Sequence, residues 1–261
     1  MRTTLLITLT ALVAACANTT RTETAGAAET TTFRLAYNNA HLIRVADRTV
    51  LFDAGLERHA ASLLDAMADL DGVVAEDFDA IVLSHGHADH AGGAAALRAA
   101  TGAPIVMGEA DQFLAEQGHN DALCPTDGTA ERRLEAAQAE TFTTFAPDTV
   151  LGTDSSATLG RLLGWEEEAG RLHSVPGHTP GSLALVVGDA VFAGDLLRGS
   201  VTGSAARTHY YLCDLDDNTQ DLRLLLDTVA PRGERFFLGH FGPVDRSDVE
   251  RLLEERRAPT D

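Results

Sequence analysis

The run Ser-His-Gly-His-Ala-Asp-His, which starts at Ser84, places four potential metal ligands within six residues: His85, His87, Asp89 and His90. Neither a hydrophobic core nor an ordinary surface needs such a density of imidazole and carboxylate. Two adjacent divalent metals do, because each must be surrounded by neutral nitrogens and hard oxygens. A helix would turn positions 85 and 87 about 200° apart, and the run follows the apolar residues 80–83. We therefore expect the ligands on a turn at the end of a strand.

The hydrophobic pattern along the rest of the chain alternates between strand and helix periodicity. Strands are expected near residues 33–37, 40–45, 49–52, 80–83, 104–107, 172–175, 182–187, 190–192 and 235–238. Helices are expected near residues 60–70, 92–100, 109–116, 130–139, 217–229 and 246–256. Two comparable halves of this kind predict an α/β domain over residues 33–261, with two facing sheets and helices outside. The turn-rich region around residues 118–152 is typical of a segment that covers a cleft.

The charge of the chain excludes several kinds of partner and chemistry. Its formal net charge is −19, and all 20 basic residues are arginine. Such a surface repels phosphate backbones, so we expect no nucleic-acid partner. The absence of lysine rules out Schiff-base catalysis and a Walker-type phosphate loop.

The first residues are typical of an export signal. Residues 1–15 combine a positive start, a short apolar stretch and small residues before Cys16. Residues 12–16 resemble a bacterial lipobox, which implies lipidation of Cys16 and a membrane-anchored protein at the periplasmic face. An ordinary cleaved secretory signal is the alternative. Residues 16–32, rich in Thr and Ala, are expected to form the anchor cysteine and a flexible tether.

Two further cysteines, Cys124 and Cys213, lie in the mature chain. In an oxidising compartment they could form a disulfide, or they could stay separate thiols, since sequence does not give the distance between their Cα atoms. Neither has the spacing of a metal ligand.

The second half of the chain supplies three more candidate ligands. His178 lies in Val-Pro-Gly-His-Thr-Pro-Gly-Ser, Asp195 in Ala-Gly-Asp-Leu and His240 in Leu-Gly-His-Phe-Gly-Pro. Each follows an expected strand at a glycine-containing turn, the edge at which α/β sheets usually build their sites. A lone histidine or aspartate there could equally be a structural residue, but together with the first cluster these three indicate a shared site.

This ordered set of motifs resembles the metallo-β-lactamase superfamily over about residues 33–253. The resemblance implies an αβ/βα four-layer sandwich with a two-metal cleft between its sheets. It assigns His85, His87 and His178 to one metal, Asp89, His90 and His240 to the other, and Asp195 to a bridge between them. Five imidazoles and two carboxylates suit Zn²⁺ best, although iron or manganese would also be accommodated.

The resemblance also implies a chemistry. Two divalent ions can hold a hydroxide between them, which attacks the carbonyl of a small ester, lactone or thioester. Asp89 would orient this nucleophile as the catalytic residue as well as bind metal. Asp53, in Leu-Phe-Asp-Ala-Gly, matches a position that hydrogen-bonds a ligand histidine, although an aspartate shortly before a glycine can also simply form a turn.

The branch of the superfamily is indicated by Asp195. Glyoxalase-II-like thioesterases and lactonases have this bridging aspartate, whereas β-lactamases that share the first motif lack it. Export favours the alternative, a periplasmic β-lactamase, because β-lactams act in that compartment. An iron-dependent persulfide dioxygenase is a third interpretation, which the complete second ligand set disfavours.

Substrate recognition is expected near the second half of the site. Arg198 could hold a substrate carboxylate, or be an ordinary surface charge. His209, Tyr210 and Tyr211 cluster where the family often has a substrate-facing loop, and a tyrosine there could donate to an oxyanion or simply be buried. The sequence does not indicate an oligomeric state.

Overall fold

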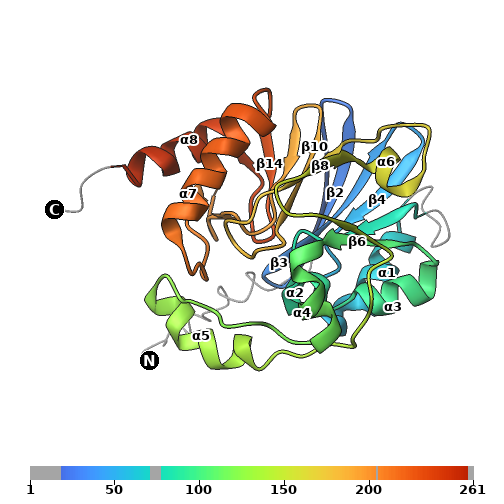
Figure 1. The fold of residues 1–261 in the computed structure, drawn as a ribbon, viewed down its shortest axis with the longest axis horizontal. Helices are drawn as coiled ribbons and strands as arrows, with labels where there is room; N and C mark the ends of the chain where they lie inside the picture. Colours follow the sequence, from blue (N-terminus) through green and yellow to red (C-terminus); the bar gives the residue numbers. More distant parts are fainter. Residues whose placement is uncertain (1–18, 71–77, 204, 258–261) are drawn as a thin grey trace, which may run out of the picture.

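The computed structural model describes residues 19–70, 78–203 and 205–257, in which two large β-sheets face each other (Figure 1). The first sheet has seven strands within the described residues. In spatial order they are β1 (Thr19–Ala25), β2 (Ala28–Leu35), β3 (Asn38–Val45), β4 (Arg48–Phe52), β5 (Ala80–Val82), β6 (Ile105–Gly108) and β7 (Thr149–Leu151). Strands β1 to β4 form an antiparallel meander, and β4 to β7 run parallel.

The second sheet has six strands within the same described part of the chain. In spatial order they are β15 (Val244–Asp245), β14 (Arg235–Phe237), β11 (Ala190–Phe192), β10 (Leu183–Val187), β9 (Arg171–Ser174) and β8 (Ser156–Thr158). The pair β11 and β14 is parallel and the other pairs are antiparallel. Strands β12 (Arg198–Gly199) and β13 (Ala206–Arg207) form a separate short antiparallel ribbon, which follows β11 in the sequence.

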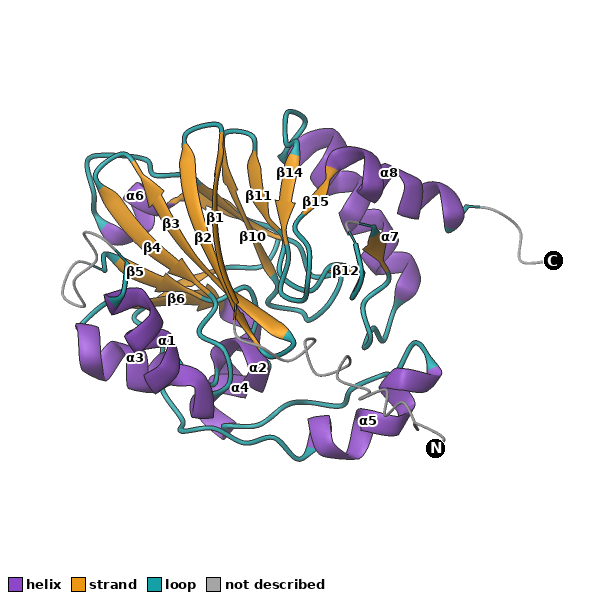
Figure 2. Ribbon diagram, turned by 180° about the vertical axis from the view of Figure 1, so that it is seen from behind, coloured by secondary structure: helices purple, strands orange, loops and turns teal. Residues whose placement is uncertain are grey.

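Helices flank both sheets within the described residues. They are α1 (Ala60–Ala68), α2 (Ala88–Ala91), α3 (Ala94–Thr101), α4 (Gln112–Gln117), α5 (Gly128–Gln138), α6 (Leu159–Leu163), α7 (Leu215–Leu224) and α8 (Arg246–Glu255). Helices α1 and α3 lie beside the first sheet and α7 and α8 beside the second, while α5 lies apart at the lower edge (Figure 2). Among the described residues, no helix is both long and apolar enough to cross a bilayer.

Three hydrophobic clusters account for these layers. The cluster between the sheets takes Phe52 and Val82 from the first sheet and Phe192 from the second. Because side chains alternate along a strand, Leu51 and Ile81 point the other way and pack with α1 and α3. A third cluster joins the second sheet to α7 and α8. This is the αβ/βα sandwich that the sequence predicts.

The prediction of a flexible tether is wrong for residues 19–32. This segment forms β1 and most of β2, which pair from Thr19 with Arg34 to Ala25 with Ala28. β-Branched threonines favour the extended backbone, and two of them, Thr30 and Thr31, are buried in the sheet. The leader at residues 1–15 and Cys16 lie outside the described residues.

Cys124 and Cys213 form a disulfide, with their Cα atoms 4.9 Å apart. It joins the segment before α5 to the segment before α7. Next to it, Leu212 N–H donates to the Cys124 carbonyl and Thr126 N–H to the Tyr210 carbonyl, each at 2.9 Å. These bonds form a small ladder, which we call the cysteine ladder, between residues 124–126 and 209–213.

Candidate metal centre

The histidine-rich turn follows β5, as the sequence predicts. His85 and His87 lie on the turn, but α2 begins at Ala88, so Asp89 and His90 lie on its one helical turn. His87 is the N-cap, with φ −68° and ψ 151°. The change from an extended residue to a helical turn places His85 and His87 before the helix and Asp89 and His90 on it.

Four of the expected ligands, His85, His90, His178 and His240, surround the carboxylate of Asp195. Its Oδ2 lies 3.2 Å from His90 Nε2, 3.1 Å from His240 Nε2, and 3.8 Å from the Nε2 atoms of both His85 and His178. The remaining carboxylate, that of Asp89, lies 3.3 Å from His240 Nε2. The central position of Asp195 is the one that a bridging ligand requires.

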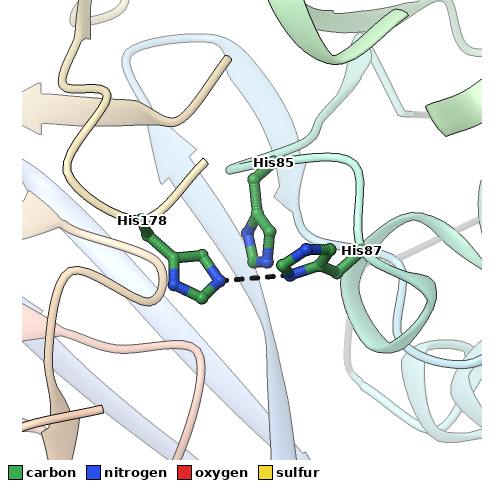
Figure 3. Close-up of side chains that lie close together, drawn as sticks. All are labelled: His85, His87 and His178. Carbon is green, nitrogen blue, oxygen red and sulfur yellow. Dashed lines mark hydrogen bonds between the residues drawn. The ribbon is translucent and has the colours of Figure 1, made fainter. Parts of the chain in front are cut away.

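The first group of three histidines closes around a single point. The rings of His85, His87 and His178 converge in Figure 3, with His178 Nε2 3.1 Å from His87 Nδ1. Two ring nitrogens at this distance can share a proton or a cation. The potential ligand atoms of the three residues all lie within 4.8 Å of one another.

The far side of the ring is held by a hydrogen bond in four of the five ligand histidines, His178 being the exception among the described residues. His87 Nε2 donates to Asp121 Oδ1 at 3.0 Å, and His240 Nδ1 donates to the Tyr37 carbonyl at 3.0 Å. Such outer bonds fix the tautomer and aim the other nitrogen at a metal. Asp121 carries no recognisable motif, and sequence reasoning missed it.

Asp53 holds two ligands at once. His90 Nδ1 donates to its Oδ2 at 2.8 Å, and His85 Nδ1 reaches it through the hydroxyl of Ser84, which lies 2.9 Å from both His85 Nδ1 and Asp53 Oδ2. The Ser84 N–H donates to Oδ1 at 2.7 Å. Asp53 is fully buried and has φ +68°, a conformation that aspartate tolerates better than most residues. The hydrogen bond expected from the sequence is therefore present.

A second buried carboxylate, Asp111, ties together the two turns that carry His85–His87 and His178. It accepts hydrogen bonds from Gly86 N–H at 2.8 Å, Gly181 N–H at 2.8 Å and the Thr179 hydroxyl at 2.6 Å. Burial raises the pKa of Asp111, and these three bonds oppose that rise. Sequence reasoning missed this residue, although its place just after β6, beside β5, was a usable signal.

The donor set fits two divalent metals. Among the described residues, buried atoms without a hydrogen-bond partner include the Nε2 of His85, His90 and His209, the Nδ1 of His178 and the Oδ1 of Asp195. Burial lowers the pKa of His85 and His178 well below the usual value, which favours the neutral form that binds metal. Burial would lower the pKa of His240 too, but Asp195 and Asp89 raise it to about 10. The carboxylates therefore draw positive charge into the site.

Gly239 is required by close packing around the ligands. A Cβ at this position would collide with Oδ1 of Asp195 and with the ring of His90. The glycine before His240 thus lets a backbone pass directly against the bridging carboxylate.

A cavity of about 390 Å³ opens on the centre. Its floor includes His87, Asp89, Asp195, His209 and His240. Its roof comes largely from α5 and the residues after it, including Ala130, Arg133, Ala137 and Glu140. The roofing role expected for residues 118–152 is thus carried by this helix.

Three of the four predicted substrate-binding residues line the cavity, and the fourth does not. His209, Tyr210 and Tyr211 line the cavity, and the Tyr211 hydroxyl donates to the Ala130 carbonyl of α5 at 3.3 Å. Arg198 is not among the lining residues. Its guanidinium lies 4.0 Å from the centre of the Tyr210 ring, so it supports the cavity wall from behind.

Comparison with known proteins agrees with this geometry. A family model described as "Metallo-beta-lactamase superfamily" matches residues 34–240. A hydroxyacylglutathione hydrolase of Anaeromyxobacter dehalogenans (strain 2CP-C) is 34% identical over 117 residues, which are 45% of this chain and 32% of that protein. The chain thus matches about a third of that relative's length.

Solved structures share the fold at low identity. A metallo-β-lactamase with a HARLDQ motif from Cronobacter sakazakii has a TM-score of 0.56 and 18% identity, covering 87% of this chain and 88% of that one. The Rm3 metallo-β-lactamase has a TM-score of 0.61 and 20% identity, with the same two coverages. At these identities the likeness concerns the fold alone.

Proposed function

The chain is a metallo-hydrolase that belongs to the metallo-β-lactamase superfamily, and we propose that it hydrolyses a small ester, lactone or thioester at a two-metal centre. The observation that carries this proposal is the position of Asp195, whose Oδ2 lies within 3.8 Å of ring nitrogens from both groups of ligands. A single-metal site would not need a buried carboxylate between two histidine clusters.

The metals would be held by His85, His87 and His178 on one side and by Asp89, His90 and His240 on the other, with Asp195 between. Five imidazoles and two carboxylates suit Zn²⁺. When bound, two such ions supply a nucleophile at neutral pH and draw charge from a carbonyl oxygen.

Asp89 belongs to the metal centre and also lines the cavity. Burial alone would raise its pKa, but His90 and His240 hold it well below the usual range. Asp89 is therefore a carboxylate at neutral pH, ready to accept a hydrogen bond from an attacking water and to orient it. The Asn38 side chain fixes this position by donating to the Asp89 carbonyl at 2.7 Å.

The cavity favours a small substrate with an apolar body and one anionic group. Of the two arginines in its lining, Arg58 is neutralised by Glu140 at 2.8 Å. Arg133 forms no ion pair or hydrogen bond with any described residue. In a chain with a net charge of −19, a free guanidinium at the roof of the site is suited to a substrate carboxylate.

The test is turnover by metal-quantified protein of a matched panel: a phenyl ester, a γ-lactone, an acyl thioester and a β-lactam. We expect about two metals per chain and hydrolysis of at least one of the first three. Asp89→Ala and His85→Ala should abolish it while the circular dichroism spectrum is kept, and the exposed His119→Gln should be unchanged. Turnover retained in Asp89→Ala, or confined to the β-lactam, contradicts the proposal.

We also propose that the protein works at the periplasmic face of a membrane, anchored through Cys16. The lipobox-like leader supports this, as does the Cys124–Cys213 disulfide, since such bonds persist in oxidising compartments. Because β1 begins at Thr19, Ala17 and Asn18 alone would separate the lipid from the sheet. Mass spectrometry of the mature N-terminus tests this; an unlipidated Cys16 in the membrane fraction contradicts it.

A further inference from the structure

His209 lies inside the metal centre, although it belongs to none of the recognised motifs. Its side chain is 3% exposed, and its Nε2 lies 3.0 Å from Oδ2 of Asp195. The ring centroid is 4.8 Å from that of His178 and 5.1 Å from that of His240. His209 thus stands between one ligand of each metal, on the side of the bridging carboxylate.

The ring of His209 is oriented in the way that the ligand rings are. Its Nδ1 lies 3.2 Å from the Tyr211 carbonyl, just as His240 Nδ1 lies 3.0 Å from the Tyr37 carbonyl. In both residues Nε2 is then turned to Asp195, at 3.0 and 3.1 Å. At 3.0 Å, Nε2 either donates a hydrogen bond to the carboxylate or shares a cation with it, and the tautomer of the ring decides between the two.

The fold fixes this position from the backbone. The Thr126 hydroxyl donates to the His209 carbonyl at 2.6 Å, and the cysteine ladder and its disulfide hold the residues that follow. An exposed loop histidine would need no such support. The potential ligand atoms of His178, Asp195 and His209 lie within 4.8 Å of one another, as do those of the first histidine group.

We propose that His209 is an eighth protein ligand of the metal centre, binding through Nε2 beside Asp195; this rests on the two-metal site of the proposed function. The competing role is a positioning one. The Tyr211 N–H also lies 3.2 Å from Nδ1, and a ring that accepts this bond would carry its proton on Nε2 and donate it to Asp195. The two roles differ in what a glutamine can replace, because its amide can donate a hydrogen bond to Asp195 but lacks an imidazole nitrogen.

The first experiment measures Zn²⁺ affinity of the apo protein against a chromophoric chelator. Loss of an outer hydrogen bond costs about 10–100-fold in metal affinity. We therefore expect His209→Gln and His209→Ala each to weaken one of the two equivalents by more than ~100-fold. The exposed His119→Gln serves as the matched control. Wild-type affinity in His209→Gln, or a loss in His209→Ala that glutamine restores, overturns the assignment.

A second experiment needs no variant. In a structure of the Zn²⁺-loaded protein we expect a bond of about 2.0–2.1 Å from metal to His209 Nε2, whereas a ring that bonds Asp195 instead refutes the proposal.

Because His209 lines the cavity, added imidazole should also restore Zn²⁺ affinity to His209→Gly and not to His85→Gly, whose ring is fully buried. If the wild-type protein binds two metals and hydrolyses its substrate while His209 stays unbound, the proposed function survives and this inference fails.

Discussion

Replacing Asp53 by asparagine should show how much metal affinity depends on the orientation of the ligand histidines, because the variant leaves all seven ligands in place. The carboxylate accepts bonds from Ser84 N–H, the Ser84 hydroxyl and His90 Nδ1, at 2.7–2.9 Å. Through Ser84 it also orients His85, which belongs to the other group of ligands. Asparagine keeps the shape and tolerates the positive φ, but its NH₂ group must face one of these donors.

The size of the effect follows from which donor loses its acceptor. If the NH₂ faces His90, the ring must move its proton to Nε2, the atom that should bind metal. We expect a ~10–100-fold loss of metal affinity, which is about 1.4–2.8 kcal/mol at 1.4 kcal/mol per tenfold. Loss of a buried hydrogen bond to a charged group should also lower the free energy of unfolding of the apo protein, by about 1.5–3 kcal/mol.

The assay is Zn²⁺ competition with a chromophoric chelator, alongside denaturant unfolding of the metal-free protein. Asp79→Asn is the matched control, because Asp79 accepts the Thr49 N–H at 2.7 Å at the other end of the same pair of strands. That variant should lose stability and keep its affinity for metal. Wild-type affinity in Asp53→Asn would refute the reasoning that Asp53 fixes the tautomers of the two ligands.

Three further variants test separate parts of the site. Gly239→Ala should abolish tight binding of one metal while it destabilises the fold by about 1–3 kcal/mol, because its Cβ would collide with the bridging carboxylate; two metals bound by this variant would contradict that. Arg133→Ala should raise KM roughly 5–30-fold for a carboxylate-bearing substrate, about 1–2 kcal/mol, and leave a neutral analogue unchanged. Arg132→Ala is its control, since that side chain is exposed and bonds within α5, and equal effects of the two would remove the case for an anionic substrate. Replacing Cys124 and Cys213 by serine should lower the free energy of unfolding by about 2–4 kcal/mol, and denaturation midpoints that do not differ would count against it.

The seven ligands were accessible to sequence reasoning because each lies in a glycine-containing segment that follows a strand, although Asp89 and His90 are carried by the short helix α2 in that segment. Strand ends of neighbouring strands meet at one edge of a sheet, so motifs such as those of His178 and His240 converge without knowledge of the fold. The same logic, applied to the short turn after β6, would have identified Asp111. It was missed because one aspartate after an expected strand has no distinguishing spacing.

His209 shows the limit of that approach. It lies in an irregular segment after β13, and its position depends on pairing with residues 124–126, far away in the sequence. No periodicity or local motif encodes that pairing, so the sequence indicated a substrate-facing residue and gave no reason to place it beside Asp195. The segment of residues 19–32 was misjudged for the opposite reason: its polar composition indicated a tether, while its threonines favoured a strand.

The cavity roof and the metal centre are connected through the cysteine ladder, so we expect substrate affinity and metal affinity to vary together. Residues 124–126 lead directly into α5, and the same residues hold the segment from His209 to Cys213. The Tyr211 hydroxyl adds a bond to the Ala130 carbonyl of α5. A movement of α5 that opens the cavity must therefore pull on the chain that presents His209 to Asp195. Substitutions that loosen the cysteine ladder should raise KM and weaken metal binding together, whereas Arg133→Ala should change KM alone.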